Sequence, residues 1–213
     1  MNIWTTSVLI LILLHTVSAR AQMAVNESKP VTIEEVHRPA ADLPHPLALP
    51  KRDFAVVQAY ADVFKILSDQ NACSSFYGGP RPATIVLNSF IPTVESHRLT
   101  RDVTFKMSGR LQMRQDPVSG TSYRLFEKVT VNNDSSFYQR RVDDPVRFPP
   151  DVGSFPPGTR AARALILLHE LGHLIRDANG AWLIPDDGYD DSRSQRNTLR
   201  IQQACRTQLW ALM

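Results

Sequence analysis

The run from Ala164 to Ile175 constrains the fold of this chain more than any other stretch, because it is apolar except around His169, Glu170 and His173. Its length and composition predict a buried helix. Two histidines four residues apart lie about 40° apart around a helix, so both imidazoles project from one face. This spacing suits two ligands of one tetrahedral zinc ion. The alternative is a buried helix with two histidines satisfied by other groups, although burying them without a metal or partners is costly.

Residues 169–173 read His-Glu-Leu-Gly-His, and this pattern resembles the active-site helix of the zincin metallopeptidases. The resemblance implies that His169 and His173 bind Zn²⁺ and that Glu170 acts as the general base, activating a zinc-bound water. It also implies an α+β fold: a small zincin-like domain whose active-site helix packs on a short, mostly antiparallel sheet, with N- and C-terminal helices. In zincins the edge strand lies along the substrate cleft, where an extended peptide pairs with it.

A third protein ligand is needed, and here the sequence departs from the best-known zincin patterns. Arg176 and Asn179 stand where the metzincin pattern requires Gly and His or Asp, and no Glu follows Glu170 to serve as in the gluzincins. Four aspartates lie just after the motif, between positions 186 and 191. Asp187 and Asp190 are the two candidates for the third ligand, and each has the alternative of capping or lying in a solvated turn.

The last fifty residues also resemble uncharacterised secreted bacterial proteins that share His-Glu-Leu-Gly-His. The matching positions are Asp187-Gly188, Ser194, Asn197-Thr198 and Cys205. This resemblance implies an exported, single-domain zincin-like unit and names no substrate. Asn197 is expected either to orient a ligand or to cap a turn.

Local signals predict the remaining elements. Asp53 is a suitable N-cap for a helix that begins at Phe54, and Thr159 is one for the motif helix, which Asn179-Gly180 is expected to end. Residues 76–80 predict a turn, and residues 84–87 are compatible with helix or strand. A last helix is expected from about Ser192 to Leu209, capped by residue 191 or 192.

Alternating apolar residues predict a pair of strands or a small meander within residues 101–141. The alternation includes Val103, Phe105 and Met107 on one side of a turn and Tyr123, Leu125, Val129 and Val131 on the other. Between them, the run from Asp116 to Gly120 has the composition of a hairpin turn.

The beginning of the chain resembles a secretory leader. A short apolar core spans residues 8–14, and Ala19-Arg20-Ala21 offers a small-x-small cleavage site. Residues 1–21 are therefore predicted to be a signal peptide, with an uncleaved anchor as the alternative. Residues 22–52 are predicted to be a proline-rich linker or pro-segment that ends at Lys51-Arg52, and residues 53–213 to be a zincin-like catalytic domain. A secreted or periplasmic location is expected.

The chain has 213 residues and a net charge of +3, which is too weak to indicate a nucleic-acid partner. Four arginines recur on the last predicted helix and favour a solvated face over an anion-binding strip: Arg193, Arg196, Arg200 and Arg206. A peptide or protein substrate is expected, without a stable membrane partner.

Cys73 and Cys205 are the two cysteines of the chain. In an exported protein such a pair most often forms one disulfide, which would close a very long loop. Two free buried thiols are the alternative.

Taken together, these patterns predict a zinc-dependent hydrolase, most specifically an exported metallopeptidase. His97, Tyr138 and Tyr189 are candidates for stabilising an oxyanion. One alternative is an exported metal-binding or structural protein that has a zincin-like fold but no turnover. Another is a hydrolase that acts on cell-wall peptide or amide bonds.

Overall fold

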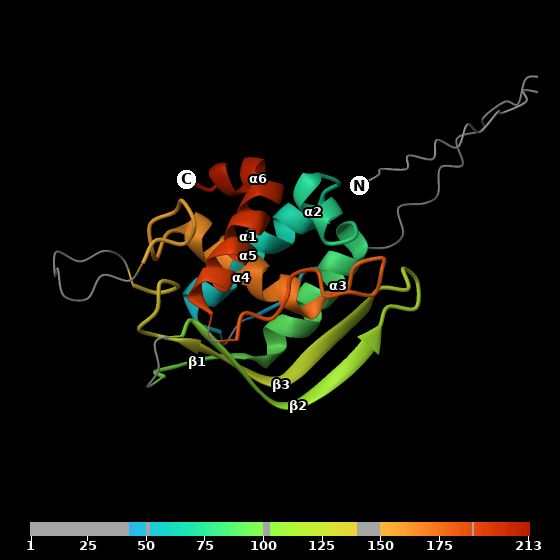
Figure 1. Ribbon diagram of the computed structural model, residues 1–213, viewed down its shortest axis with the longest axis horizontal. Helices are drawn as coiled ribbons and strands as arrows, with labels where there is room; N and C mark the ends of the chain where they lie inside the picture. Colours follow the sequence, from blue (N-terminus) through green and yellow to red (C-terminus); the bar gives the residue numbers. More distant parts are fainter. Residues whose placement is uncertain (1–42, 50–51, 100–102, 140–149, 189) are drawn as a thin grey trace, which may run out of the picture. The chain divides into compact units, whose positions relative to one another are not determined.

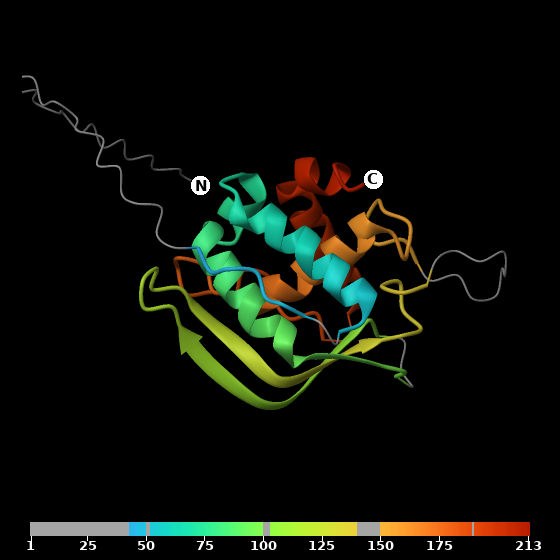
Figure 2. The same ribbon diagram turned by 180° about the vertical axis from the view of Figure 1, so that it is seen from behind.

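The computed structural model describes residues 43–49, 52–99, 103–139, 150–188 and 190–213 (Figure 1). The helices are α1 Phe54–Ser68, α2 Ala72–Phe76, α3 Pro80–Phe90, η1 Ile91–Thr93, α4 Arg160–Leu174, α5 Asp191–Ala204 and α6 Arg206–Trp210. The strands are β1 Val94–His97, β2 Phe105–Gln115 and β3 Ser122–Asn132. Figures 1 and 2 show the helices on one face of the sheet, which confirms the predicted α+β class.

Side-chain caps set the starts of α1 and α4 where the sequence predicts them. Asp53 accepts a hydrogen bond from the amide of Ala55 at 2.8 Å, and Thr159 accepts one from the amide of Ala162 at 3.2 Å. These caps satisfy backbone donors that the first turn of a helix leaves free. Residues 84–87, which the sequence leaves open, are helical and lie in α3.

The sheet has the strand order β1-β3-β2, so β3 is its central strand. β2 and β3 form the predicted antiparallel pair, and the amide of Gly120 closes the turn on the carbonyl of Asp116 at 2.9 Å. The side chains of β3 expected to face the core are buried: Tyr123, Leu125, Val129 and Val131. The short strand β1 pairs in parallel with the end of β3, which makes the sheet mixed. The sequence did not predict β1.

Helix α4 runs through the core. Its leucines at positions 165, 168, 171 and 174 are fully buried. The buried Tyr77 hydroxyl donates to the backbone carbonyl of Leu168 at 2.7 Å, so α2 and α4 are tied directly before the first histidine of the motif. This environment explains why a helix with so few polar side chains is stable here.

The predicted end of this helix at Asn179-Gly180 is wrong, because α4 ends at Leu174. Ile175 is extended and forms an antiparallel bridge with Tyr123, and the amide of Arg176 donates to the carbonyl of Ser122 at 3.0 Å. Pairing with β3 therefore replaces the last helical turn. Gly180, at φ +79°, instead occupies the tight turn that follows.

The last predicted helix is divided in two at Cys205, which ends α5 and precedes α6. The four arginines of this region are exposed, as expected: Arg193, Arg196, Arg200 and Arg206. Cys205 forms a disulfide with Cys73 of α2, across a separation of 132 residues. The predicted disulfide is confirmed.

The end of the predicted proline-rich lead-in lies against the helices. Residues 43–49 form neither helix nor strand. The amide of Leu47 donates to the hydroxyl of Tyr60 at 2.6 Å, and Asn88 donates to the carbonyl of His45 at 3.0 Å. The predicted signal peptide and the greater part of the predicted linker lie outside the described residues. Within the described ranges, no helix combines the length and the hydropathy needed to cross a membrane.

Candidate metal centre

The two motif histidines meet at one point, as their spacing predicts. His169 and His173 lie in the last two turns of α4 and are 6% and 7% exposed. Their Nε2 atoms are 3.0 Å apart. Two imidazoles that face each other this way can share only one proton, so the arrangement leaves a lone pair directed at the point between them.

Asp187 brings a carboxylate to the same point. Its Oδ2 lies 2.9 Å from Nε2 of His169 and 3.6 Å from Nε2 of His173. Tetrahedral ligands with metal bonds of about 2.0–2.1 Å are separated from one another by about 3.3 Å. The three atoms therefore have the spacing that a small divalent ion requires, and these residues form a group able to hold a metal ion.

Asp190, the other candidate ligand, has a different place. It is the N-cap of α5, where its Oδ1 accepts a hydrogen bond from the amide of Arg193 at 3.0 Å. The cap was expected one or two residues later in the sequence. Of the two aspartates, the structure brings Asp187 to the histidines and leaves Asp190 at the start of the helix.

One face of α5 holds the ligands in place. The hydroxyl of Thr198 lies 3.0 Å from Nδ1 of His169, and the amide of Asn197 donates to Oδ1 of Asp187 at 2.5 Å. Asn197 also donates to the carbonyl of Pro185 at 2.9 Å, which fixes the loop that carries Asp187. Such outer hydrogen bonds orient metal ligands and set their tautomers. The sequence suggested this role for Asn197 but not for the adjacent Thr198.

Asp187 and His173 each shift the pKa of the other toward its charged form. Burial alone would raise the pKa of Asp187, but hydrogen bonds with His169 and His173 outweigh it and hold this pKa far below its usual range. Burial acts to lower the pKa of His173, yet its hydrogen bond with Asp187 and the nearby charge of Glu170 raise that pKa overall. A carboxylate that stays ionised beside two imidazoles is the donor set that a divalent cation prefers.

Glu170 is the group at this centre that is suited to proton transfer. Burial raises its pKa above the usual carboxyl value, although the two histidines act to lower it. Within the described ranges, its carboxylate forms no hydrogen bond or ion pair. A base whose pKa is shifted toward neutrality and whose oxygens are not engaged is well placed to accept a proton.

Two of the three candidate oxyanion stabilisers, His97 and Tyr138, lie away from this centre. His97 ends β1 and pairs with Asn132 of β3. Arg124, which contacts the backbone of His173, lies eight residues earlier along β3. Eight residues of strand span about 26 Å. Tyr138 is hydrogen-bonded to Ser96 of the same strand. Tyr189 lies outside the described residues.

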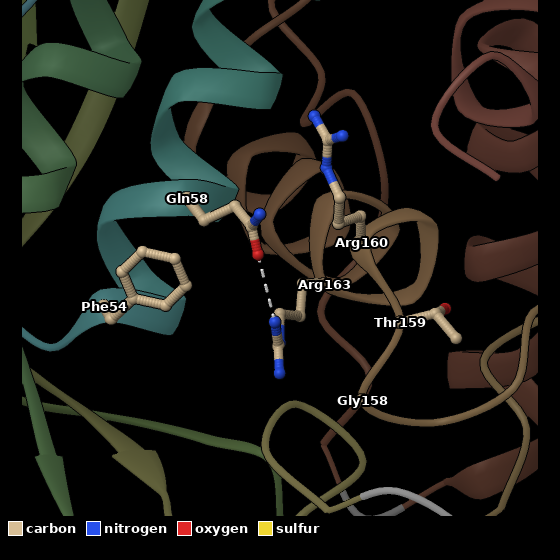
Figure 3. Close-up of a pocket in the computed structure, with 6 residues that line it drawn as sticks. All are labelled: Phe54, Gln58, Gly158, Thr159, Arg160 and Arg163. Atoms are coloured by element: carbon tan, nitrogen blue, oxygen red, sulfur yellow. Dashed lines mark hydrogen bonds between the residues drawn. The ribbon is translucent and has the colours of Figure 1, made fainter.

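A cavity of about 400 Å³ lies at the other end of α4 (Figure 3). It is lined by Phe54, Gln58, Gly158, Thr159, Arg160 and Arg163. Arg163 donates to the side-chain oxygen of Gln58 at 3.3 Å, and Arg160 forms an ion pair with Asp62. Arg163, the lining residue nearest to the histidines in the sequence, precedes His169 by six residues, or about 9 Å of helix, and none of the three candidate metal ligands lines the cavity.

Comparisons of the chain with protein-family models, with curated proteins and with solved structures found no match. The roles of His169, His173, Asp187 and Glu170 therefore have to follow from their chemistry in this fold.

Proposed function

We propose that this protein is a metal-dependent hydrolase, most specifically an exported zinc metallopeptidase. The observation that carries the proposal is the convergence of Nε2 of His169, Nε2 of His173 and Oδ2 of Asp187 on one point, with distances of 2.9–3.6 Å between them. Three protein ligands and an open position are the usual composition of a catalytic zinc site.

His169, His173 and Asp187 would hold the ion, and their nitrogen and oxygen donors favour zinc among the common divalent cations. When bound, zinc acts as a Lewis acid and lowers the pKa of a water molecule. Glu170 then takes the proton from the attacking water and passes it to the leaving amine. Thr198 and Asn197 keep His169 and Asp187 oriented throughout.

Two features support an exported peptidase in particular. The disulfide between Cys73 and Cys205 is compatible with an extracellular or periplasmic environment, because such bonds persist where the surroundings are oxidising. The His-Glu-Leu-Gly-His sequence on a buried helix is the arrangement by which zincins cleave peptide bonds. The disulfide thus supports export, and the His-Glu-Leu-Gly-His helix supports a peptide or protein substrate.

The proposal is tested by measuring the metal content of the purified mature protein together with that of His169→Ala. We expect about one zinc per chain in the wild type and its loss in the variant. Hydrolysis of a generic unfolded protein is then compared between the wild type and Glu170→Gln, which should keep its metal and lose turnover by a factor of at least about 10².

The outcomes separate the candidate functions. A wild-type chain that binds no metal after zinc is supplied would refute the metal centre. Retained turnover in Glu170→Gln would refute the assigned base. A chain that binds zinc but cleaves neither unfolded protein nor cell-wall peptide would instead be an exported metal-binding protein.

A further inference from the structure

The second ring nitrogen of His173 is the least satisfied polar group of the metal centre. Nδ1 of His173 is buried and has no hydrogen-bond partner among the described residues. The corresponding atom of His169 has the hydroxyl of Thr198 at 3.0 Å. Buried polar groups of this kind normally have a partner, so the difference between the two histidines requires an explanation.

A carboxylate lies close to this nitrogen but just out of reach. Oδ1 of Asp186 is 3.9 Å from Nδ1 of His173. A hydrogen bond between such atoms requires about 2.7–3.0 Å, so an approach of about 1 Å would form it. The distance between these two atoms is too short for a water molecule to bridge them with two normal hydrogen bonds.

Arg124 of β3 fixes Asp186 beside the histidine. Its Nε donates to the backbone carbonyl of His173 at 2.9 Å, and its two terminal nitrogens donate to the carboxylate of Asp186. The guanidinium is almost fully buried and stacks on the ring of Trp182, with 4.1 Å from its carbon to the ring centre. The bidentate pair therefore places the carboxylate next to His173 with little freedom to leave.

Metal binding through Nε2 requires His173 to carry its proton on Nδ1. A histidine that binds a metal almost always donates this second N–H to a carboxylate, a carbonyl or a water. We propose that Asp186, held by Arg124, is the outer carboxylate that accepts this hydrogen bond when the centre is loaded. Asp186 and Arg124 are thus positioning residues, and the proposal rests on the metal-dependent function proposed above.

The competing explanation is that the Arg124–Asp186 pair only ties the loop before α5 to the sheet. Asp186→Asn distinguishes the two, because an asparagine side-chain oxygen still accepts from Arg124 but is a much weaker acceptor for His173 than a carboxylate. Asp186 is 62% exposed in its side chain, so the substitution leaves the core unchanged. Asp190→Asn is the matched control, since it changes an exposed aspartate of the same segment that caps α5.

The experiment titrates the metal-free mature protein with Zn²⁺ and measures affinity, and it records the ¹⁵N signals of the histidine rings with metal bound. We expect Asp186→Asn to weaken zinc binding by roughly 10- to 100-fold, against a change of less than about 3-fold in Asp190→Asn. The Nδ1–H signal of His173 should shift in Asp186→Asn and not in the control. Asp186→Glu, which retains a carboxylate, should recover part of the affinity.

Equal zinc affinity and an unchanged His173 signal in Asp186→Asn would overturn this proposal while leaving the metal centre intact. A wild-type chain that binds no zinc would overturn both proposals together. A loss of zinc affinity in Asp186→Asn with an unchanged His173 signal and a lower melting temperature of the metal-free protein would overturn the positioning role. It would show instead that the Arg124–Asp186 pair only ties the loop to the sheet.

Discussion

Gly172 and Ile184 are in such close contact that a Cβ atom on Gly172 would lie 3.0 Å from both Cγ1 and Cδ1 of Ile184. The amide of Ile184 also donates to the carbonyl of Gly172 at 3.3 Å. The glycine of the His-Glu-Leu-Gly-His sequence thus lets the returning chain lie directly on α4. Three residues later this chain supplies Asp187, so the contact sets the distance between the candidate third ligand and the helix.

Replacing Gly172 with valine should displace Ile184 and, with it, Asp187. We expect a loss of about 1–3 kcal/mol in the free energy of unfolding, because the added methyl groups have no room. Zinc affinity should fall as well. Denaturant unfolding and zinc titration measure the two effects, and Ala178→Val, at an exposed position, should change stability by less than about 0.5 kcal/mol. Unchanged zinc affinity in Gly172→Val would show that this contact does not position Asp187.

The hydroxyl of Thr198 should matter for metal binding more than for folding. Thr198→Val removes the partner of Nδ1 of His169 while keeping the shape of the side chain. We expect zinc affinity to fall by about 10-fold or more and stability to change by about 1 kcal/mol. Thr198→Ser keeps the hydroxyl and is the control, expected near the wild type. Equal losses in both variants would mean that the methyl group, and not the hydrogen bond, is important.

Removing the disulfide should lower stability strongly. Joining residues 132 apart restricts the unfolded chain, and the chain-entropy treatment gives about 5 kcal/mol for a loop of this length. The double variant Cys73→Ala/Cys205→Ala should lose most of this amount in denaturant unfolding. A reducing agent should bring the wild type to the same stability and leave the double variant unaffected. A double variant as stable as the oxidised wild type would contradict the expectation.

Asp116 should make the stability depend on pH in the acid range. Burial raises the pKa of Asp116, but hydrogen bonds from Ser119 and the charge of Arg81 outweigh it, so the folded pKa is lowered. The unfolded state therefore binds the proton first as pH falls. The stabilisation is complete above the ordinary carboxyl pKa near 4 and is lost as pH falls through the lowered value.

Asp116→Asn should consequently cost about 1–2 kcal/mol at neutral pH, and the difference from the wild type should vanish in acid. Urea unfolding at several pH values checks this. Asp134→Asn is the control, because it removes an exposed ion pair with Arg98 and should cost less than about 1 kcal/mol. A difference for Asp116→Asn that is the same at every pH would contradict the assigned charge effect.

Signals carried by neighbouring residues made much of this fold predictable. The caps at Asp53 and Thr159 and the turn from Asp116 to Gly120 each depend on hydrogen bonds within a few positions of the chain. Such bonds are decided by residue type and spacing, so the sequence is sufficient to place them.

Elements that depend on distant partners were not predictable in this way. β1 is four residues long and exists because it pairs in parallel with β3, some 35 positions later. Likewise, α4 ends early because Ile175 pairs with Tyr123. In both places long-range pairing overrides the local pattern, and no short window of sequence contains the deciding partner.

The candidate metal centre likewise combines features that neighbouring residues decide with features that distant partners decide. His169 and His173 follow from helical spacing alone. The choice between Asp187 and Asp190 depends on which one caps α5, and both have the right chemistry and nearly the same position in the chain. Arg124 gave no signal, because a single arginine in an alternating strand usually faces solvent, whereas this one reaches the end of α4.

The bond between Cys73 and Cys205 has a consequence for metal selection beyond the restriction of the unfolded chain. Free thiolates are softer ligands than imidazole or carboxylate and would compete for zinc, above all in a chain that has not yet folded. Once oxidised, neither sulfur can take part. If the centre binds zinc as proposed, oxidation before metal loading would leave the ion to the nitrogen and oxygen donors of the folded site, and an oxidising compartment would then prevent misplaced metal binding.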